Sequence, residues 1–184
     1  MTYAIRIHQT GGPEVLSWES VDLPAPAAGE ATVRHAAVGL NFIDTYHRTG
    51  LYPLPLPAGI GLEAAGVVEA VGAEVTEVKV GDRVAYAGGP VGAYAEARNI
   101  PAHRLLKLPD GIAFDTAAAM MLQGLTAAYL LRRTYRVQAG DAVLIHAAAG
   151  GVGLLACQWA KALGATVIGT VGSVAKGELA KAHG

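Results

Sequence analysis

A glycine-rich turn carries the clearest chemistry in the sequence. Residues 147–153 read AAAGGVG and directly follow Ala142–His146, a continuous apolar run that is typical of a strand in a parallel sheet. In the G-x-G-x-x-G register, Ala148 takes the first position, Gly150 the second and Gly153 the third. Ala148 would make the tight turn after the strand. This order of strand, glycine turn and helix predicts a dinucleotide site, and a turn without a ligand is the alternative.

Each position of the turn has a physical task in such a site. Gly150 would let the backbone approach a pyrophosphate, and Gly153 would let the following helix pack closely on the strand. The amides of Gly151 and Val152 would donate hydrogen bonds to the pyrophosphate at the positive end of the helix dipole.

The end of the second strand bears on the choice of cofactor. Sites for NAD usually place an acid there, about 20 residues after the glycines, where it binds the ribose 2′-hydroxyl. Here the expected strand Ala165–Thr170 is followed by no acid before Glu178. Gly172, Ser173 and Lys176 are the candidate contacts instead, since a hydroxyl and an ammonium group suit a 2′-phosphate. The sequence therefore favours NADPH over NADH, and a solvated Lys176 in the first turn of a helix is the alternative.

The composition excludes several classes of protein. Fourteen basic residues face 15 acidic ones among 184, a formal charge of −1, so no basic surplus points to nucleic acid. The most apolar stretch, Ala142–Ala156, is too short and too interrupted to span a membrane, and the N-terminus does not resemble a signal peptide. The single cysteine, Cys157, rules out an intramolecular disulfide framework and is expected to be an ordinary packed residue. We expect a cytoplasmic protein.

Residues 1–110 predict a β-rich region. Short apolar runs alternate with Gly and Pro, and strands are expected at the N-terminus and in three further segments, Ala31–Val38, Gly66–Gly72 and Gly81–Ala85. Pro53, Pro55 and Pro57 make residues 51–58 an extended loop rather than a helix.

From Phe114 the composition becomes helical, in two stretches around residues 115–121 and 125–131. Beyond them, the strand at residues 142–146, a helix at Leu154–Leu163 closed by Gly164, the strand at 165–170 and a helix at Lys176–His183 form a right-handed crossover unit. We therefore predict an α/β protein, with a β-rich domain over residues 1–124 and the start of a doubly wound domain over 125–184.

Several motifs together carry a resemblance over essentially all 184 residues. The sequence resembles the zinc-independent quinone oxidoreductases of the medium-chain dehydrogenase/reductase superfamily, which include zeta-crystallin. The motifs are the segments 11–16 (GGPEVL), 39–46 (GLNFIDTY) with Arg48 and 50–53 (GLYP), 61–66 (GLEAAG), 80–84 (VGDRV), 124–126 (GLT) and 146–153 (HAAAGGVG).

The resemblance implies a GroES-like first domain, a Rossmann cofactor domain, NADPH as hydride donor, a quinone substrate and a homodimer. It places Asn41, Tyr46 and Tyr52 in the cleft between the domains, with Asn41 near the nicotinamide ribose or a quinone oxygen and the tyrosines near the quinone. Asn41 and Tyr46 are the candidate catalytic residues. Thr126 matches a position beside the nicotinamide. The alternatives are a turn-forming Asn41, tyrosines that only pack, and a Thr126 that caps a following helix.

Zinc alcohol dehydrogenases of the superfamily differ at the metal ligands. This chain has Asn41 where their Cys ligand would lie and Leu62 where their His ligand would lie, and the four cysteines of their structural zinc lobe are absent. The six histidines show no metal-ligand spacing. We expect no zinc.

The leading hypothesis is transfer of hydride from NADPH to a quinone, with water able to supply the proton. Reduction of the C=C bond of α,β-unsaturated ketones and a non-catalytic NADPH-binding protein are the alternatives. A doubly wound sheet of about six strands needs roughly 150 residues. Since only about 45 follow Gly140, we expect the chain to be an N-terminal portion, weak in NADPH binding and inactive by itself.

Overall fold

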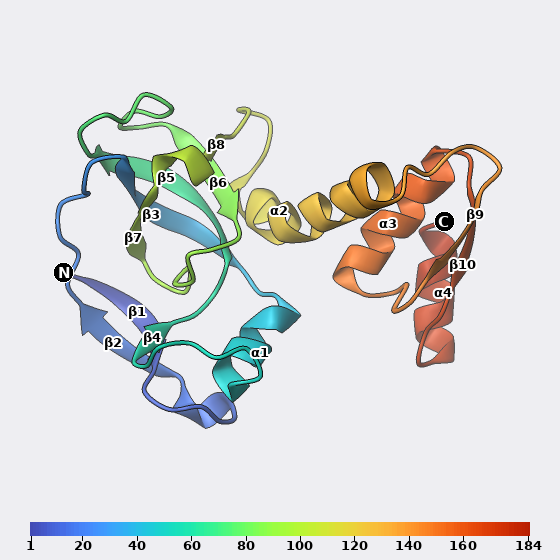
Figure 1. Ribbon diagram of the computed structural model, residues 1–184, viewed down its shortest axis with the longest axis horizontal. Coiled ribbons are helices and arrows are strands. Elements are labelled where there is room, and N and C mark those ends of the chain that lie inside the picture. Colours follow the sequence, from blue (N-terminus) through green and yellow to red (C-terminus); the bar gives the residue numbers. More distant parts are fainter. The chain divides into compact units, whose positions relative to one another are not determined.

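The structure is a computed structural model that describes residues 1–184. The chain divides into two compact units, Met1–Leu122 and Gln123–Gly184, and each contains its own hydrophobic core (Figure 1). The division falls within helix α2 (Phe114–Tyr129), the helix that also contains the boundary expected between residues 124 and 125.

The core of the first unit is built on a five-stranded antiparallel sheet. In spatial order its strands are β7 (Ala97–Pro101), β3 (Glu30–Gly39), β5 (Glu63–Val71), β6 (Arg83–Ala87) and β8 (Leu106–Lys107). Side chains from four of these strands, including Val33, Val68, Val84 and Ile100, are almost completely buried together. β-branched residues suit such a pleated, packed surface, which is why these short runs fold as strands.

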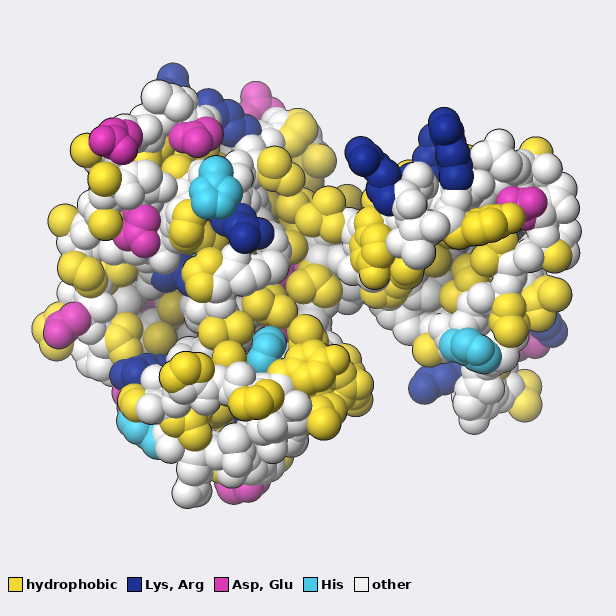
Figure 2. All heavy atoms as spheres, in the orientation of Figure 1, with side chains coloured by type: hydrophobic (Ala, Val, Ile, Leu, Met, Phe, Trp, Pro, Cys, Tyr) yellow, Lys and Arg dark blue, Asp and Glu magenta, His cyan; other side chains and the backbone are white.

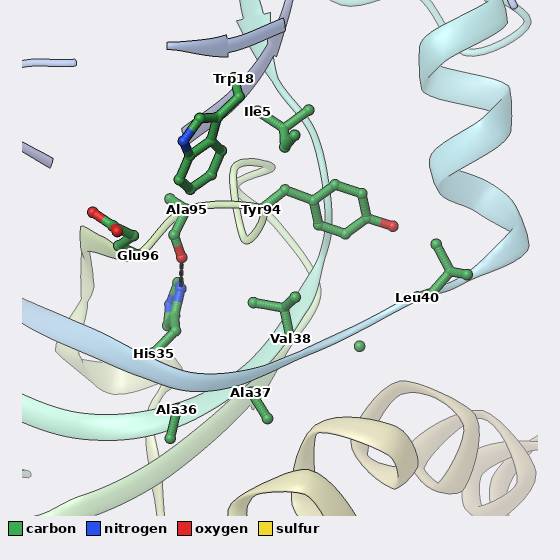
Figure 3. A pocket seen from close by; sticks show the side chains of 11 residues that line it. Ile5, Trp18, His35, Ala36, Ala37, Val38, Leu40, Tyr94, Ala95 and Glu96 are labelled. Atoms are coloured by element: carbon green, nitrogen blue, oxygen red, sulfur yellow. Dashed lines mark hydrogen bonds between the residues drawn. The ribbon is translucent and has the colours of Figure 1, made fainter. Parts of the chain in front are cut away.

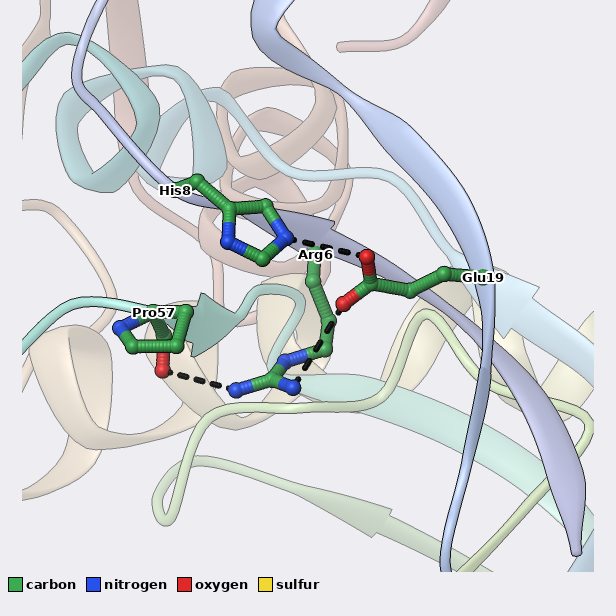
Figure 4. Close-up of polar contacts among 4 residues, drawn as sticks. All are labelled: Arg6, His8, Glu19 and Pro57. Carbon is green, nitrogen blue, oxygen red and sulfur yellow. Dashed lines mark hydrogen bonds and ion pairs between the residues drawn. The ribbon is translucent and has the colours of Figure 1, made fainter.

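A smaller sheet completes the β-structure of this unit. Its order is β2 (Ser17–Val21), β1 (Thr2–Ile7) and β4 (Ala58–Gly59), and two single 3-10 turns lie at Pro13–Val15 and Ala102–Arg104. Arg6 on β1 connects three segments, because its guanidinium pairs with Glu19 on β2 at 3.4 Å and donates to the carbonyl of Pro57 at 3.0 Å (Figure 4). The same carboxylate of Glu19 lies 2.9 Å from His8. These contacts hold the proline-rich loop against the small sheet.

The expected strands of the first unit are confirmed with shifted ends. β5 begins at Glu63, three residues before the predicted start, and β6 begins at Arg83 because Gly81 sits in a left-handed turn at φ 89°. Residues 51–57 are free of helix and strand, as the prolines require. Helix α1 (Phe42–Thr49) lies between β3 and this loop and was not predicted.

The second unit is a parallel pair of strands covered by helices. β9 (Ala142–Ile145) pairs with β10 (Thr166–Gly169), and helices α3 (Gly151–Ala162) and α4 (Val174–Ala182) follow the two strands (Figure 1). Gly164 has a left-handed φ of 85° just after α3, as predicted for a helix end. The predicted order of strand, turn, helix, strand and helix is confirmed.

Two details of the helices differ from the prediction. α2 is one continuous helix, followed by a π-helical turn at Leu130–Thr134, where two helical stretches were expected. Thr126 therefore lies inside α2 and cannot cap a following helix, so that alternative is wrong. α3 begins at Gly151, three residues before the predicted Leu154, because the glycine turn itself supplies the first helical residues.

Acidic and basic side chains are interspersed over the face of the first unit seen in Figure 2, with no broad patch of one sign. None of the helices has both the length and the apolarity needed to cross a bilayer.

Candidate functional site

Asn41 begins helix α1 at the end of strand β3. Its backbone is extended, with φ −126° and ψ 148°, and its N–H donates to Oδ2 of Asp44 at 2.9 Å. Gly50, with φ 83°, ends the same helix. Asn41 therefore occupies the N-cap position of α1, which agrees with the turn-forming alternative for this residue.

The side chain of Asn41 also has a buried partner. Its Nδ2 donates to Oε2 of Glu63 at 2.6 Å, and Oε1 of Glu63 accepts from the backbone N–H of Leu122 at 2.7 Å. The β3–β5 register explains this contact, since it pairs Gly39 directly with Glu63. A Cβ at Gly39 would lie 2.2 Å from the carbonyl oxygen of Ala118 and 2.3 Å from Oε2 of Glu63, so only glycine fits there.

Burial shapes the electrostatics around Asn41. Glu63 has no exposed surface, and burial raises its pKa, while the hydrogen bonds from Asn41 and the α2 backbone act in the opposite direction. Asp44 is 2% exposed and accepts from the hydroxyl of Tyr94 at 2.8 Å. Burial and this acceptor raise the pKa of Tyr94, so that hydroxyl keeps its proton.

Tyr46 on α1 and Tyr52 in the following loop lie next to each other. Their rings lie 5.2 Å apart at 61°, and Phe42 meets Tyr46 edge to face at 5.3 Å. Phe42 and Tyr52 remain exposed by 74% and 47%. Exposed aromatic rings of this kind offer apolar faces and a phenolic donor, which suits a flat ligand with a polar oxygen.

Neither residue at the two positions of the zinc ligands can bind zinc. Leu62 is a buried hydrocarbon side chain, and the Asn41 side chain donates its amide hydrogen bond to Glu63. The structure contains no group of three or more His, Cys, Asp or Glu side chains that could hold a metal ion. Independence from zinc stays a prediction, founded on the chemistry of these side chains.

An apolar pocket of about 380 Å³ lies elsewhere in the first unit. Trp18, Val38 and Leu40 line it together with Tyr94, whose hydroxyl points away toward Asp44, and with His35, whose Nδ1 lies 2.7 Å from the carbonyl of Ala95 (Figure 3). None of the predicted site residues lines this pocket.

The glycine turn of the second unit forms the N-terminus of helix α3. Gly150 is the N-cap of α3, so the N–H groups of Gly151, Val152 and Gly153 have no acceptor within the helix. A Cβ at Gly153 would lie 2.3 Å from the carbonyl oxygen of Ala147, which shows how closely α3 packs on the turn. Gly150, Val152 and Gly153 also line a pocket of about 400 Å³. These residues fit a dinucleotide, because a glycine-lined helix N-terminus is what a pyrophosphate requires.

Two features of the turn were not anticipated. The left-handed residue is Ala147, with φ 51°, whereas Ala148 is fully buried and donates its N–H to the carbonyl of Thr170 at 3.0 Å. The tight turn was expected at Ala148, but packing in the core and this hydrogen bond fix Ala148 in place. Sequence reasoning also missed Gln123, whose side chain lies where a Cβ on Gly151 would be, with Oε1 at 2.3 Å. No spacing rule connects Gln123 to the turn, so the sequence held no signal for it.

The candidate residues for the cofactor's 2′-phosphate follow β10. Ser173 is the N-cap of α4 and its Oγ accepts from the N–H of Lys176 at 3.3 Å. β9 and β10 are parallel, and their last residues, Ile145 and Gly169, pair with each other. The glycine turn and the start of α4 therefore both lie at the carboxyl ends of the strands. Gly172 has no heavy atom within 4 Å of an added Cβ, so close packing does not explain this glycine.

Cys157 lies on α3 and is 2% exposed, with a pKa that burial raises. Its buried, protonated thiol agrees with the expectation of an ordinary packed residue.

Comparison with known proteins identifies the domain of the first unit. Residues 27–110 match the alcohol dehydrogenase GroES-like domain. The chain therefore carries this domain, followed by the opening strands and helices of a Rossmann domain.

The chain is similar to several quinone oxidoreductases and to a 2-haloacrylate reductase. The chain is 58% identical over 185 residues to quinone oxidoreductase from Pseudomonas aeruginosa, covering 100% of this chain and 57% of the relative. It is 48% identical over 191 residues to 2-haloacrylate reductase from a Burkholderia species, with the same coverages. It matches the crystal structure of Escherichia coli quinone oxidoreductase complexed with NADPH at a TM-score of 0.96 and 52% identity, over 99% of this chain and 56% of the other. The resemblance inferred from the motifs is confirmed, and the chain spans a little over half the length of these relatives.

Proposed function

We propose that the chain supplies the GroES-like part and the first cofactor-binding part of a zinc-independent NADPH:quinone oxidoreductase. The observation that carries this proposal is the N-terminus of α3, where the N–H groups of Gly151 and Val152 have no acceptor within the helix and could donate to a pyrophosphate. Quinone oxidoreductase relatives, one of them complexed with NADPH, support the proposed cofactor and substrate.

When bound, NADPH supplies the hydride, and the residues of this chain bind the cofactor and orient it. Gly151 and Val152 would hold the pyrophosphate, Gly150 would allow its approach, and Ser173 with Lys176 would bind the 2′-phosphate. In this proposal Ala148 and Gly172 shape the backbone around the cofactor, and Thr126 lies beside the nicotinamide.

The aromatic residues at α1 are proposed to receive the acceptor. Tyr46 and Tyr52 would pack on a flat quinone and donate a hydrogen bond to the oxygen that gains negative charge, while Asn41 would orient a neighbouring polar group. Positioning of two planar rings is the main contribution of the protein, since the hydride chemistry belongs to the cofactor.

One relative favours a second reaction, reduction of the C=C bond of an α,β-unsaturated carbonyl compound. This relative is the 2-haloacrylate reductase, and a haloacrylate is a conjugated alkene of this kind. A non-catalytic NADPH-binding protein would bind the cofactor and reduce neither acceptor.

We also propose a cytoplasmic homodimer that requires neither nucleic acid nor membrane, which agrees with the balanced charge and the buried single thiol.

The test is consumption of NADPH by the full-length protein, with a benzoquinone and an enone as competing acceptors. We expect quinone-dependent NADPH oxidation that falls in Tyr46→Phe and Asn41→Ala. Faster turnover of the enone would favour the alternative reaction, and turnover of neither would overturn the enzymatic proposal. The same protein should gain more thermal protection from NADPH than from NADH, and the reverse order would overturn the cofactor assignment.

A further inference from the structure

Gly151 is the glycine of the turn that the dinucleotide pattern does not explain. In the G-x-G-x-x-G register it follows Gly150 at an x position, where the pattern allows any side chain. It is also the first residue of α3, although helices favour alanine over glycine. The structure supplies a reason, because a Cβ at Gly151 would lie 2.3 Å from Oε1, 2.5 Å from Cδ and 2.6 Å from Nε2 of Gln123. The amide of Gln123 therefore occupies the space directly beside the start of α3.

Packing of α2 against α3 holds Gln123 at this position. Ala127 and Leu131, four and eight residues further along the chain, are buried in one cluster with Ala156 and Ala160 of α3. Side chains at this spacing share one face of a helix, so Gln123 belongs to the stripe of α2 that packs along α3. Its place beside the glycine turn is therefore set by two packed helices rather than by a loop.

The amide of Gln123 is not used within the chain. Its side chain forms no hydrogen bond with another residue, and neither of its polar atoms is among the fully buried atoms that lack a partner. Both polar atoms are therefore accessible to a ligand at the start of α3. A phosphate oxygen only accepts hydrogen bonds, and the NH₂ group of a glutamine side chain has two hydrogens to donate.

We propose that Gln123 is a cofactor-binding residue, whose Nε2 donates a hydrogen bond to the pyrophosphate of NADPH beside the N–H groups of Gly151 and Val152. This inference rests on the proposed function, because the pyrophosphate belongs to the proposed cofactor. It deepens that function by adding a side-chain donor from α2 to the backbone donors of α3. Residue 151 then lacks a side chain because a methyl group there would displace the amide.

Two exchanges of similar size separate hydrogen bonding from space filling. Gln123→Met keeps an unbranched side chain without a donor, and Gln123→Glu replaces the donor by a charge that repels phosphate. In the full-length protein we expect an NADPH dissociation constant about tenfold higher in Gln123→Met. Gln123→Glu should bind still more weakly, and the difference between the two variants should shrink at high salt.

Gln158→Met is the matched control for these exchanges. Gln158 lies on α3, and its Nε2 donates to the carbonyl of Leu154 at 3.0 Å, so its amide already has a partner within the helix. The NADPH dissociation constant of this variant should equal that of wild type.

A double-variant cycle tests the contact between Gln123 and the turn. Gly151→Ala keeps the backbone N–H but places a methyl group where the amide lies, so it should weaken NADPH binding about as much as Gln123→Ala does. The double variant should bind no more weakly than either single variant, because both changes remove the same contact. Losses that add would contradict the proposal. This cycle uses only small side chains, so it decides the question even where Gln123→Met or Gln123→Glu does not fold.

A shortened ligand locates the contact along the cofactor. 2′-Phospho-ADP-ribose retains the pyrophosphate and lacks the nicotinamide, so Gln123→Met should weaken its binding as much as that of NADPH. A loss confined to NADPH would assign Gln123 to the nicotinamide and overturn the proposal. Unchanged or tighter NADPH binding in Gln123→Met would overturn it as well, since a side chain that only obstructs the turn gives that result. Absence of NADPH binding by wild type would instead contradict the proposed function, and this contact with it.

Discussion

The amide nitrogen of Asn41 lies 2.6 Å from a carboxylate oxygen of Glu63, and Glu63 has no exposed surface. This contact joins the first residue of β5 to the N-cap of α1, and the second oxygen of Glu63 joins both to the N–H of Leu122 in α2. The pair therefore stabilises three elements of the first unit as well as the candidate site.

Removal of the Glu63 carboxylate should destabilise the first unit. Glu63→Ala leaves the Asn41 amide and the Leu122 N–H without acceptors, at a cost of about 1–3 kcal/mol for each group. Glu63→Gln preserves volume and an acceptor, so its loss should be smaller. Urea unfolding, monitored by Trp18 in a Trp159→Phe background, measures both. Equal stability of the Ala variant and wild type would contradict the structural role.

His35 should make the first unit sensitive to mild acid. Burial lowers its pKa from 6.5 to about 4, with Nε2 3.0 Å from the hydroxyl of Tyr86. As the pH falls, His35 therefore takes up a proton in the unfolded chain at a higher pH than in the folded chain. The contribution of neutral His35 to the free energy of unfolding is complete above pH 6.5. It is lost as the pH falls toward 4, by about 3 kcal/mol at most.

In His35→Gln this part of the pH dependence should vanish, since Gln offers a donor and an acceptor without titrating. Unfolding free energies between pH 7 and pH 4, roughly the window of this shift, measure the effect. His103→Gln, at an exposed position, is the matched control and should retain the wild-type slope. A wild-type slope in His35→Gln would refute the assignment.

Gly153 should tolerate no side chain. The Cβ of Gly153→Ala would lie 2.3 Å from the carbonyl oxygen of Ala147, and moving backbone to relieve such a contact costs about 1–3 kcal/mol. Gly172→Ala, with open space around its Cβ, should leave stability unchanged. Unfolding followed through Trp159 in a Trp18→Phe background compares the two. Similar stabilities would show that α3 can move away from the turn.

Lys176 and Ser173 should set the preference for NADPH over NADH. Replacing Lys176 by Ala removes a charge-assisted contact with the 2′-phosphate, so the ratio of NADPH to NADH affinity should fall about tenfold or more, and less at high salt. Lys181→Ala is the control on the same helix, because Lys181 pairs with Glu178 at 3.1 Å. Calorimetric titration with both cofactors measures the ratio. An unchanged ratio in Lys176→Ala would remove this residue from the site.

Ser173 has a second role that can be separated from cofactor choice. Its Oγ caps α4 by accepting from Lys176 N–H, so Ser173→Ala should cost about 1 kcal/mol of stability. Ser173→Asp keeps the cap but adds a charge that repels the 2′-phosphate. It should retain stability and lose NADPH affinity, and retention of both would argue against a phosphate at this position.

The second unit was largely predictable because its determinants are local. An apolar run, three glycines at fixed spacing and a Gly after the helix define strand, turn and helix within about thirty residues. The early start of α3 at Gly151 and the left-handed Ala147 were missed, since the exact turn depends on how Ala148 packs and on its bond to Thr170.

The first unit was predictable in type but not in detail. Its strands follow from alternating apolar residues and prolines, yet α1 has too few periodic residues to be recognised alone, and the motif around Asn41 indicated a site only through family resemblance.

By itself the sequence determined the β-rich and Rossmann parts, the glycine turn, the family, and the presence of Asn41 and Leu62 at the two positions where zinc alcohol dehydrogenases have metal ligands. Only the tertiary structure decided the partners of the site: Glu63 against Asn41, Tyr94 against Asp44, and Gln123 over Gly151. Local patterns fix backbone conformation over neighbouring residues. Contacts between distant residues depend instead on strand register and helix packing, which set Gly39 opposite Glu63 and thereby place a buried carboxylate beside an amide 22 positions away.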